Sequence, residues 1–338
     1  MEALVWNEEG TIVRRTDVSE PSPAPNQVKV QVMAEGVCMT DIEMVRGRLK
    51  FAKPPWILGH EMAGIVTEAG ALASEWKPGD RVVVDPVVTC GSCRYCATGK
   101  KYLCAGGGEL GTTYGSGGYG QYVLVPASNL YRLPDAMSFE EGAMMEPLNC
   151  TLGAIHRVPD LVGKRALVFG PGPAGLLFVQ LAKLYGAASV TLAGTRDEKL
   201  LLGAALGADR TVNVRAGGEA NALEDEAFDV VIEASGSLDA VRDAFRCVDR
   251  SGTVVLYGLN GSEAPSIVSD RVIGKDLTIV TCISAPLLWQ KGIDLAASGR
   301  IRLKDIVTLR VPFEEAESVL NAIVRGENKT TKAMMYRE

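Results

Sequence analysis

Histidine is scarce in this 338-residue chain, and basic residues are fewer than acidic ones. There are two histidines, His60 and His156, so any chemistry that needs an imidazole must use one of them. The 35 lysines and arginines face 41 acidic residues, which gives a net charge of −6. This charge excludes a general electrostatic attraction to nucleic acid or to an anionic membrane surface.

Long apolar runs and an export signal are also missing. No uninterrupted apolar run reaches the ~20 residues that a membrane-spanning helix needs. The N-terminal MEALVWNEEG has neither the basic nor the apolar region of a signal peptide. We therefore expect a cytoplasmic protein without a membrane or nucleic-acid partner. Because disulfides are rare in the cytoplasm, the eight cysteines favour a metal over a disulfide framework.

The apolar pattern divides the chain into two kinds of sequence. Residues 1–153 contain short alternating runs such as QVKVQV, separated by glycine and proline, which predict strands and turns. In residues 154–288, apolar runs such as RALVF alternate with helical segments, which predicts a doubly wound parallel sheet. Residues 289–338 continue no such rhythm, and we expect them to return to the first domain.

Four of the eight cysteines lie within fifteen residues, at Cys90, Cys93, Cys96 and Cys104. Four thiolates in one short loop are the ligand set of a closed, tetrahedral structural zinc site. An iron–sulfur cluster is the alternative, but the fourth spacing differs from the bacterial motif and no proline follows Cys104. We predict a structural zinc lobe at about residues 88–106.

A second motif, GPGPAG, lies between the predicted strand RALVF and an apolar helix. Gly170 makes the turn, Gly172 lets the backbone approach a pyrophosphate, and Gly175 lets the helix pack closely on the strand. Pro173 and Ala174 begin the helix, whose free N–H groups favour phosphate. This context predicts a dinucleotide-binding site.

The end of the next strand, SVTLAGTRDEK, bears on the choice of dinucleotide. An acidic residue is expected about 20 positions after the motif to bind the ribose, but Gly194 stands there, followed by Thr195 and Arg196. An arginine can bind a 2′-phosphate through two hydrogen bonds, so we expect NADP(H) rather than NAD(H). The alternative is that Asp197 takes the acidic role after a longer turn.

A third set of residues is dispersed: Cys38 in GVCMTD, His60 and Glu61 in GHEMAG, and Glu146 in EPLNC. A thiolate, an imidazole and carboxylates suit a catalytic zinc with an open position. The residues are too far apart in sequence for spacing to show that they meet. The alternative is that Cys38 is a small buried side chain and His60 an ordinary core histidine.

Taken together, the three motifs resemble the zinc-dependent medium-chain dehydrogenase/reductase family, and EPLNC is most similar to its sorbitol (polyol) and threonine dehydrogenase branch. GHEMAGIVTEAG is similar to the family's zinc signature, and the cysteine lobe and GPGPAG follow in the family's order. The resemblance implies a GroES-like β-barrel catalytic domain over 1–153 and 289–338, and a Rossmann domain over 154–288. It also implies two zinc ions per subunit and a homodimer or homotetramer.

The resemblance assigns roles to the dispersed residues. It implies that Cys38, His60 and Glu61 hold the catalytic zinc, with Glu146 as an exchangeable fourth ligand or a water-mediated partner. The assignment between the two glutamates stays open. Thr40 matches the family's serine or threonine that hydrogen-bonds the substrate oxygen and begins a proton relay.

Several further residues are candidates for the same site. Asp41 is expected to orient His60 or a neighbouring backbone group. Glu43 stands where many relatives carry a histidine, so the proton would leave through Glu43 or directly through water. Tyr119 falls where relatives place an aromatic residue in the substrate pocket. Trp56 and Trp289 are further candidates, although either of these two tryptophans can be core.

Three residues that end strands of the second domain are expected to contact the cofactor at the carboxyl edge of the sheet: Ala234, Gly258 and Leu259. The apolar run 277–283 is expected to pair between subunits.

The sequence therefore predicts a zinc-dependent oxidoreductase that transfers a hydride between a secondary alcohol and NADP or NAD. The substrate would be a small polyol, cyclitol or similar polar compound. One alternative is a threonine-type β-hydroxy amino acid dehydrogenase, for which Arg48 or Lys53 would bind the carboxylate. Another is a non-catalytic NAD(P)-binding sensor, which would have no use for an open zinc site. The segment TCISAPLLW lacks the arginine of sorbitol-type enzymes, which argues against plain sorbitol specificity.

Overall fold

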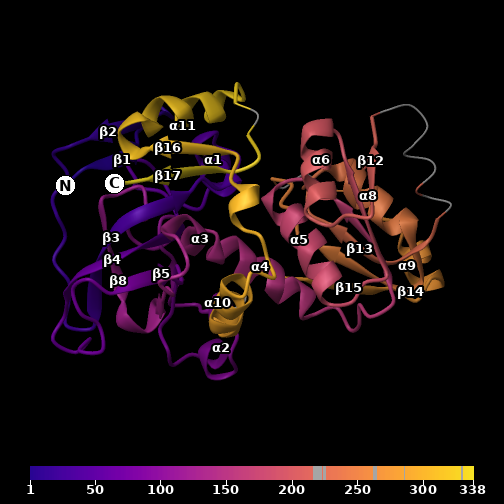
Figure 1. Ribbon diagram of the computed structural model, residues 1–338, viewed down its shortest axis with the longest axis horizontal. Helices are drawn as coiled ribbons and strands as arrows, with labels where there is room; N and C mark the ends of the chain where they lie inside the picture. Colours follow the sequence, from indigo (N-terminus) through magenta and orange to yellow (C-terminus); the bar gives the residue numbers. More distant parts are fainter. Residues whose placement is uncertain (216–222, 224–225, 262–264, 285, 329) are drawn as a thin grey trace. The chain divides into compact units, whose positions relative to one another are not determined.

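The computed structural model describes residues 1–338 except 216–222, 224–225, 262–264, 285 and 329. Its contacts divide the chain into two units (Figure 1). The first unit contains Met1–Glu146, Pro286–Ser298 and Leu303–Glu338, and the second contains Pro147–Ala285 and Gly299–Arg302. The first division falls within helix α4 (Met145–Ile155), a few residues before the break at 153 that the sequence predicts. Among the described residues, no helix is both long and apolar enough to cross a membrane.

A seven-stranded sheet forms the centre of the first unit. Its order is β16–β17–β3–β4–β5–β9, with β8 also paired to β3. Strand β3 buries Val28, Val30 and Val32, as the alternation in QVKVQV predicts. The strands are β3 (Gln27–Gly36), β4 (Glu61–Ala69), β5 (Arg81–Val84), β8 (Tyr122–Pro126), β9 (Leu130–Arg132), β16 (Leu309–Pro312) and β17 (Ala333–Tyr336).

Short strands and helices surround this sheet. Two small antiparallel pairs are formed by β1 (Ala3–Trp6) with β2 (Ile12–Arg15), and by β6 (Val87–Val88) with β7 (Gly108–Glu109). Helix α11 lies beside β16 and β17 (Figure 1) and buries Leu320 and Ile323 in a core shared with Ile12 and Met44. The helices are α1 (Met39–Val45), α2 (Arg94–Ala97), α3 (Phe139–Ala143), α10 (Trp289–Ala297) and α11 (Ala316–Arg325). The 3₁₀ turns are η1 (Lys101–Leu103), η2 (Ala127–Asn129), η3 (Pro286–Leu288), η4 (Lys304–Ile306) and η5 (Phe313–Glu315).

The register of three strands places distant residues side by side. Gly36, at the end of β3, pairs with Glu61 at the start of β4 and with Met334 in β17. Lys332 immediately precedes β17. The pairing therefore brings residues from three parts of the sequence to one place in the first unit.

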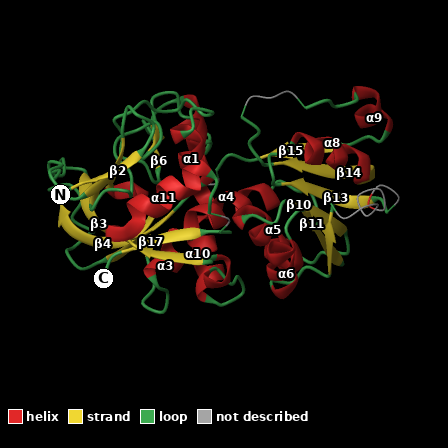
Figure 2. Ribbon diagram, turned by 90° about the horizontal axis from the view of Figure 1, so that it is seen from above, coloured by secondary structure: helices red, strands yellow, loops and turns green. Residues whose placement is uncertain are grey.

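The second unit is built on a six-stranded parallel sheet. Its order, β12–β11–β10–β13–β14–β15, is that of a doubly wound dinucleotide-binding fold, with a switch point between β10 and β13. Figure 2 shows α5 and α6 on one side of this sheet and α8 on the other. The strands are β10 (Arg165–Phe169), β11 (Ser189–Gly194), β12 (Arg210–Asn213), β13 (Phe228–Glu233), β14 (Val248–Leu256) and β15 (Thr278–Thr281). The helices are α5 (Pro173–Leu184), α6 (Asp197–Ala205), α8 (Leu238–Cys247) and α9 (Ser269–Gly274).

Candidate metal and cofactor sites

Three of the dispersed residues meet in the first unit. One ligand atom from each of Cys38, His60 and Glu61 lies within 4.8 Å of the other two. Cys38 precedes α1, and His60 and Glu61 stand at the beginning of β4. His60 and Glu61 are buried, and Cys38 is half-buried. One thiolate, one imidazole and one carboxylate in this arrangement fit a zinc ion that keeps a position open.

Glu146 stands apart from this group. It lies in the first turn of α4, and its negative charge raises the pKa of Lys332, the residue that contacts Glu61. The carboxylate is therefore close enough to influence the site electrostatically. Its role as a metal ligand stays a prediction.

Asp41 lies behind His60, as the sequence predicts for an orienting residue. Asp41 is fully buried, and its Oδ1 lies 3.3 Å from Nδ1 of His60, although the two atoms are not aligned as a hydrogen bond. Burial would lower the pKa of His60, but the charges of Asp41 and Cys38 outweigh it and raise that pKa well above its usual value. Because Nδ1 of His60 faces Asp41, Nε2 is the ring nitrogen available to a metal. A metal that binds Nε2 would displace the proton from that nitrogen.

A buried lysine that sequence reasoning missed contacts the same group. Nζ of Lys332 donates to Oε2 of Glu61 and to the carbonyl oxygen of Val37, the latter at 3.1 Å. The side chains of Lys332 and Glu61 are 2% and 3% exposed. Burial would lower the pKa of Lys332, but Glu61, Cys38 and Glu146 outweigh it and raise that pKa. No motif could have found this pair, since 271 positions separate its members.

A buried carboxyl, Glu35, is the second residue that sequence reasoning missed. Its Oε1 accepts a hydrogen bond from the backbone N–H of Glu61 at 3.0 Å. Burial, followed by the charge of Asp41, raises the pKa of Glu35 well above its usual value, which favours the neutral form. Gly118 makes the room, because a Cβ there would lie 1.8 Å from Oε2 of Glu35.

The predicted proton relay begins on α1. Thr40 is half-buried, two residues after Cys38. The carboxylate of Glu43 is already bound by two guanidinium groups, Arg46 at 2.6 Å and Arg48 at 3.2 Å. The residue that replaces the histidine of many relatives is therefore held in ion pairs.

The cysteine lobe also assembles. One sulfur atom from each of Cys90, Cys93, Cys96 and Cys104 lies within 4.8 Å of the others. Backbone N–H groups of Ser92 and Cys93 lower the pKa of Cys90 to about 6. A thiolate is thus favoured at neutral pH, and four sulfur atoms in one cluster fit a closed tetrahedral zinc site.

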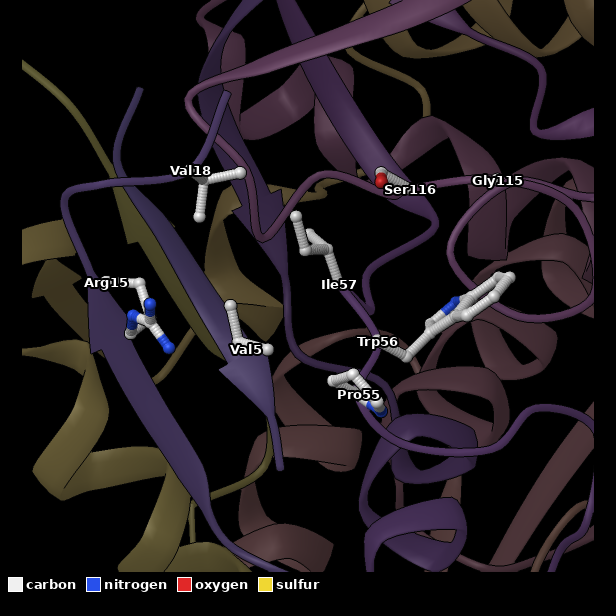
Figure 3. Close-up of a pocket in the computed structure, with 8 residues that line it drawn as sticks. All are labelled: Val5, Arg15, Val18, Pro55, Trp56, Ile57, Gly115 and Ser116. Carbon is white, nitrogen blue, oxygen red and sulfur yellow. The ribbon is translucent and has the colours of Figure 1, made fainter. Parts of the chain in front are cut away.

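Two aromatic residues expected in the substrate pocket, Tyr119 and Trp56, both lie in the first unit. Tyr119 is fully buried in the core, and its hydroxyl donates to Oδ2 of Asp41 at 3.2 Å. It therefore contacts the carboxylate beside His60, and its place in a substrate pocket stays a prediction. Trp56 lines a pocket of about 420 Å³. Figure 3 shows Trp56 and Arg15 on opposite sides of this pocket, with Pro55 and Ile57 near Trp56.

GPGPAG forms the turn from β10 to α5 in the second unit, as predicted. Gly170 has a φ of +100°, and a Cβ there would lie 2.8 Å from Ser235. A Cβ on Gly175 would lie 1.8 Å from the carbonyl oxygen of Gly170. Among the described residues, no atom lies within 4 Å of a Cβ built on Gly172. The turn is thus closed on its protein side and open beside Gly172, where a pyrophosphate fits.

The loop after β11 explains the missing acidic residue. A Cβ on Gly194 would lie 2.5 Å from the ring of Pro171, so this position has no room for a side chain. Arg196 caps α6 and is exposed, while the pKa of Lys199 is lowered to about 8 by burial and then by Arg196. Asp197 accepts a hydrogen bond from Nδ2 of Asn213 at 2.6 Å. The loop therefore presents one exposed basic side chain, Arg196, with the buried Lys199 close to it.

The loops after β13 and β14 pack tightly against each other. Oε1 of Glu233 accepts hydrogen bonds from the backbone N–H groups of Ser235 and Gly236. A Cβ on Gly258 would lie 2.2 Å from the nitrogen of Gly236. The backbone N–H of Ala234 donates to Phe169, and Leu259 is exposed. These residues lie at the carboxyl edge of the sheet, and their contact with a cofactor stays a prediction.

Two family models match the chain. The alcohol dehydrogenase GroES-like domain matches residues 24–135, and the zinc-binding dehydrogenase domain matches residues 173–298.

Individual proteins are similar over almost the whole length. Sorbitol dehydrogenase of Bacillus subtilis is 30% identical and aligns over 94% of this chain and 93% of its own. L-threonine 3-dehydrogenase of Marinomonas sp. is also 30% identical, over 92% and 93%. A Sinorhizobium meliloti protein, described as a zinc-binding dehydrogenase and solved with NADP, superposes with a TM-score of 0.91 at 32% identity. That superposition covers 99% of this chain and 98% of the other.

Proposed function

The chain belongs to the zinc-binding alcohol dehydrogenase family, and from this premise we propose that it interconverts a secondary alcohol of a polyol or cyclitol and its ketone with NADP(H). The observation that carries the proposal is the convergence of Cys38, His60 and Glu61 in the first unit. A sensor without catalysis would not need a metal site with an open position. These three residues therefore favour an enzyme over a binding protein.

The chemistry divides between bound groups and the chain's own residues. When bound, a zinc ion polarises the substrate oxygen as a Lewis acid and NADP⁺ accepts the hydride of the carbinol carbon, so that the alcohol becomes a ketone. Cys38, His60 and Glu61 would hold the metal, and the carboxylate of Asp41 lies beside Nδ1 of His60, where it favours one orientation of the ring. Thr40 relays the proton, since its hydroxyl takes up the substrate's hydroxyl proton as its own proton passes to water. Water is the acceptor because Arg46 and Arg48 already bind Glu43.

Three features of the loop after β11 support a preference for NADP(H). Gly194 has no room for an acidic side chain, and Asp197 is directed to Asn213. Arg196 is exposed, so its guanidinium group can bind a 2′-phosphate, and Lys199 adds a second basic side chain close by. The similar Sinorhizobium meliloti protein was solved with NADP.

The substrate class rests on the relatives and on one ion pair. The similar proteins include a sorbitol dehydrogenase and a threonine 3-dehydrogenase. An amino acid substrate needs a cation for its carboxylate, and Arg48, one of the two candidates, is already paired with Glu43. This pairing favours a neutral polyhydroxy substrate.

Two features bear on the metal content and the subunit assembly: the two groups of metal-ligand candidates and an edge strand of the second unit. We expect two zinc ions per subunit, one in the cysteine lobe and one at the catalytic group. Strand β15 is the edge of the six-stranded sheet and carries the exposed Ile279, with the exposed Ile283 just beyond it. A second copy can pair with this edge, which supports a homodimer or a tetramer built from dimers. A cytoplasmic location stays a prediction.

Initial rates of the zinc-replete protein test the function. The panel contains polyols, inositols, simple secondary alcohols and threonine, each with NADP⁺ and with NAD⁺, and cofactor reduction is followed by absorbance. We expect reduction with a polyol or inositol, faster with NADP⁺, and a loss of that preference in Arg196→Ser. Lys183→Ser, which removes a half-buried basic side chain of the second unit that pairs with Asp209, is the control and should keep the preference. If a protein that binds zinc and NADP⁺ reduces the cofactor with no compound of the panel, the proposal is contradicted.

A further inference from the structure

The buried pair of Lys332 and Glu61 has no part in the reaction as proposed so far. Lys332 comes from the segment before β17 and Glu61 from the start of β4, on either side of the end of β3. Nζ of Lys332 binds Oε2 of Glu61 and the carbonyl oxygen of Val37, the residue next to Cys38. The lysine therefore occupies one oxygen of a metal-ligand candidate and leaves the other oxygen for a metal.

Gly36 provides the space for this pair. A Cβ on Gly36 would lie 2.1 Å from Oε2 of Glu61 and 3.0 Å from Cε of Lys332. The backbone of Gly36 is not in the left-handed region, so its conformation does not require glycine. The small residue is instead required by the ion pair, which fills the volume that any side chain would take.

The positive charge of Lys332 also contributes to the balance of charge at the site. Cys38, Glu61 and Glu146 carry up to three negative charges, and a divalent cation balances two of them. Lys332, a buried basic side chain in contact with Glu61, supplies a further positive charge. Removing a charged lysine side chain from water is costly. The burial of Lys332 beside a carboxylate therefore indicates that its ammonium group has a role in the site.

A carboxylate can bind a metal through one oxygen or through two. A catalytic zinc needs a position for its substrate, which a second carboxylate oxygen would fill. We infer that Lys332 restricts Glu61 to one metal-binding oxygen and thereby keeps a coordination position open for the substrate. This inference rests on the proposed function, because it needs a metal at Cys38, His60 and Glu61. Lys332 is a positioning residue, since it touches Glu61 and not the reacting atoms.

The test uses the full-length protein with Co²⁺ in place of zinc, because the d–d absorption bands of Co²⁺ report its coordination. Imidazole, a neutral ligand for the open position, is titrated while these bands are followed. The Cys38→Ser variant is expected to bind Co²⁺ only in the cysteine lobe. Its spectrum is subtracted, so that the remaining bands report the ion at the catalytic group. We expect a saturable shift in the wild type. In Lys332→Met the dissociation constant should rise about tenfold or more, because imidazole must displace the second oxygen of Glu61.

Two variants serve as controls. Lys332→Arg keeps a charged donor and should bind imidazole nearly as the wild type does. Lys29→Met removes a lysine that pairs with Glu20 and Glu68 on the same sheet, and it should change nothing. If Lys332→Met does not fold, Gly36→Ala replaces it, since its Cβ forces Oε2 of Glu61 away from the lysine and should weaken imidazole binding in the same way.

The outcomes separate this inference from the proposed function. Equal imidazole affinity in Lys332→Met and wild type, or a wild-type spectrum that imidazole does not change, overturns the role of Lys332 alone. A wild-type protein that binds Co²⁺ only in the cysteine lobe contradicts the proposed function itself, and the inference with it.

Discussion

Single residues set the chemistry of the first unit, and Thr40 is the one that the mechanism uses most directly. Replacing Thr40 by valine keeps the shape of the side chain and removes the proton acceptor. We expect kcat to fall by about 10²-fold with little change in KM, since loss of a positioned proton-transfer group costs about this much. Steady-state rates measure the effect, and Thr40→Ser should stay within a few-fold of the wild type. An unchanged kcat in Thr40→Val would show that the proton takes another route.

Asp85 makes the stability of the protein depend on pH. Burial raises its pKa from 3.8 to about 7, although the N–H of Val87 bonds the carboxylate. Between these values the folded state binds more protons than the unfolded state, so the free energy of unfolding falls as the pH rises and levels off above about 7. From about pH 5.5 to about pH 8 this group should cost about 2 kcal/mol.

Urea unfolding of zinc-saturated wild type and Asp85→Asn at the two pH values measures this cost. The amide carries no charge, so the variant should lose less stability than the wild type over the same interval. Equal losses in the two proteins would mean that Asp85 does not titrate there.

Sequence reasoning named Cys38, His60 and Glu61 because their motifs resemble a known pattern, and the structure brings them within 4.8 Å. It missed Lys332 and Glu35, because their places depend on the register of β17, β3 and β4, which no local motif reveals. It placed Tyr119 in the substrate pocket because relatives place an aromatic residue at this position. The burial of Tyr119 against Asp41 depends on packing that composition does not report.

At the scale of elements, the cysteine lobe depends on its metal more than on a core. Helix α2 has four residues and buries none, and η1 has three and buries none. Such short elements bury too little apolar surface to stabilise a loop, so we expect a bound zinc ion to hold it.

Cys96→Ser tests this dependence, since it removes one of the four sulfur ligands. We expect the zinc content to fall by one ion per subunit. A loss of ~2 kcal/mol in a unit of this size lowers the melting temperature by roughly 4–8 °C. Calorimetry with metal analysis gives both values, and Cys247→Ser, a cysteine outside both metal groups, is the control. An unchanged zinc content would contradict the assignment of the lobe.

Elements with a strong local pattern were predictable. The alternation in QVKVQV corresponds to β3, and RALVF followed by GPGPAG corresponds to β10, its turn and α5. The shape of the loop after β11 was less predictable. Position 194 is a glycine because the ring of Pro171, in the GPGPAG turn, leaves no room for a side chain there. The direction of Asp197 depends likewise on Asn213 at the end of β12.

At the scale of the whole molecule, the two units carry different candidate sites. The first holds both metal groups, and the second holds the parallel sheet with the phosphate-binding turn. The sequence predicted the return of the C-terminal segment, because its strand and helix follow no parallel-sheet rhythm. It could not place the division inside α4, since a continuous helix carries no local signal where its contacts change from one unit to the other.

The central claim is that two separate metal sites are present and that the second one is catalytic. Metal counting by mass spectrometry under native conditions, on wild type and His60→Ala, tests it most directly. The account predicts two zinc ions per subunit in the wild type and one in His60→Ala, which should also lose its activity while the cysteine lobe stays filled. One zinc ion in the wild type, or two in the variant, would contradict the account.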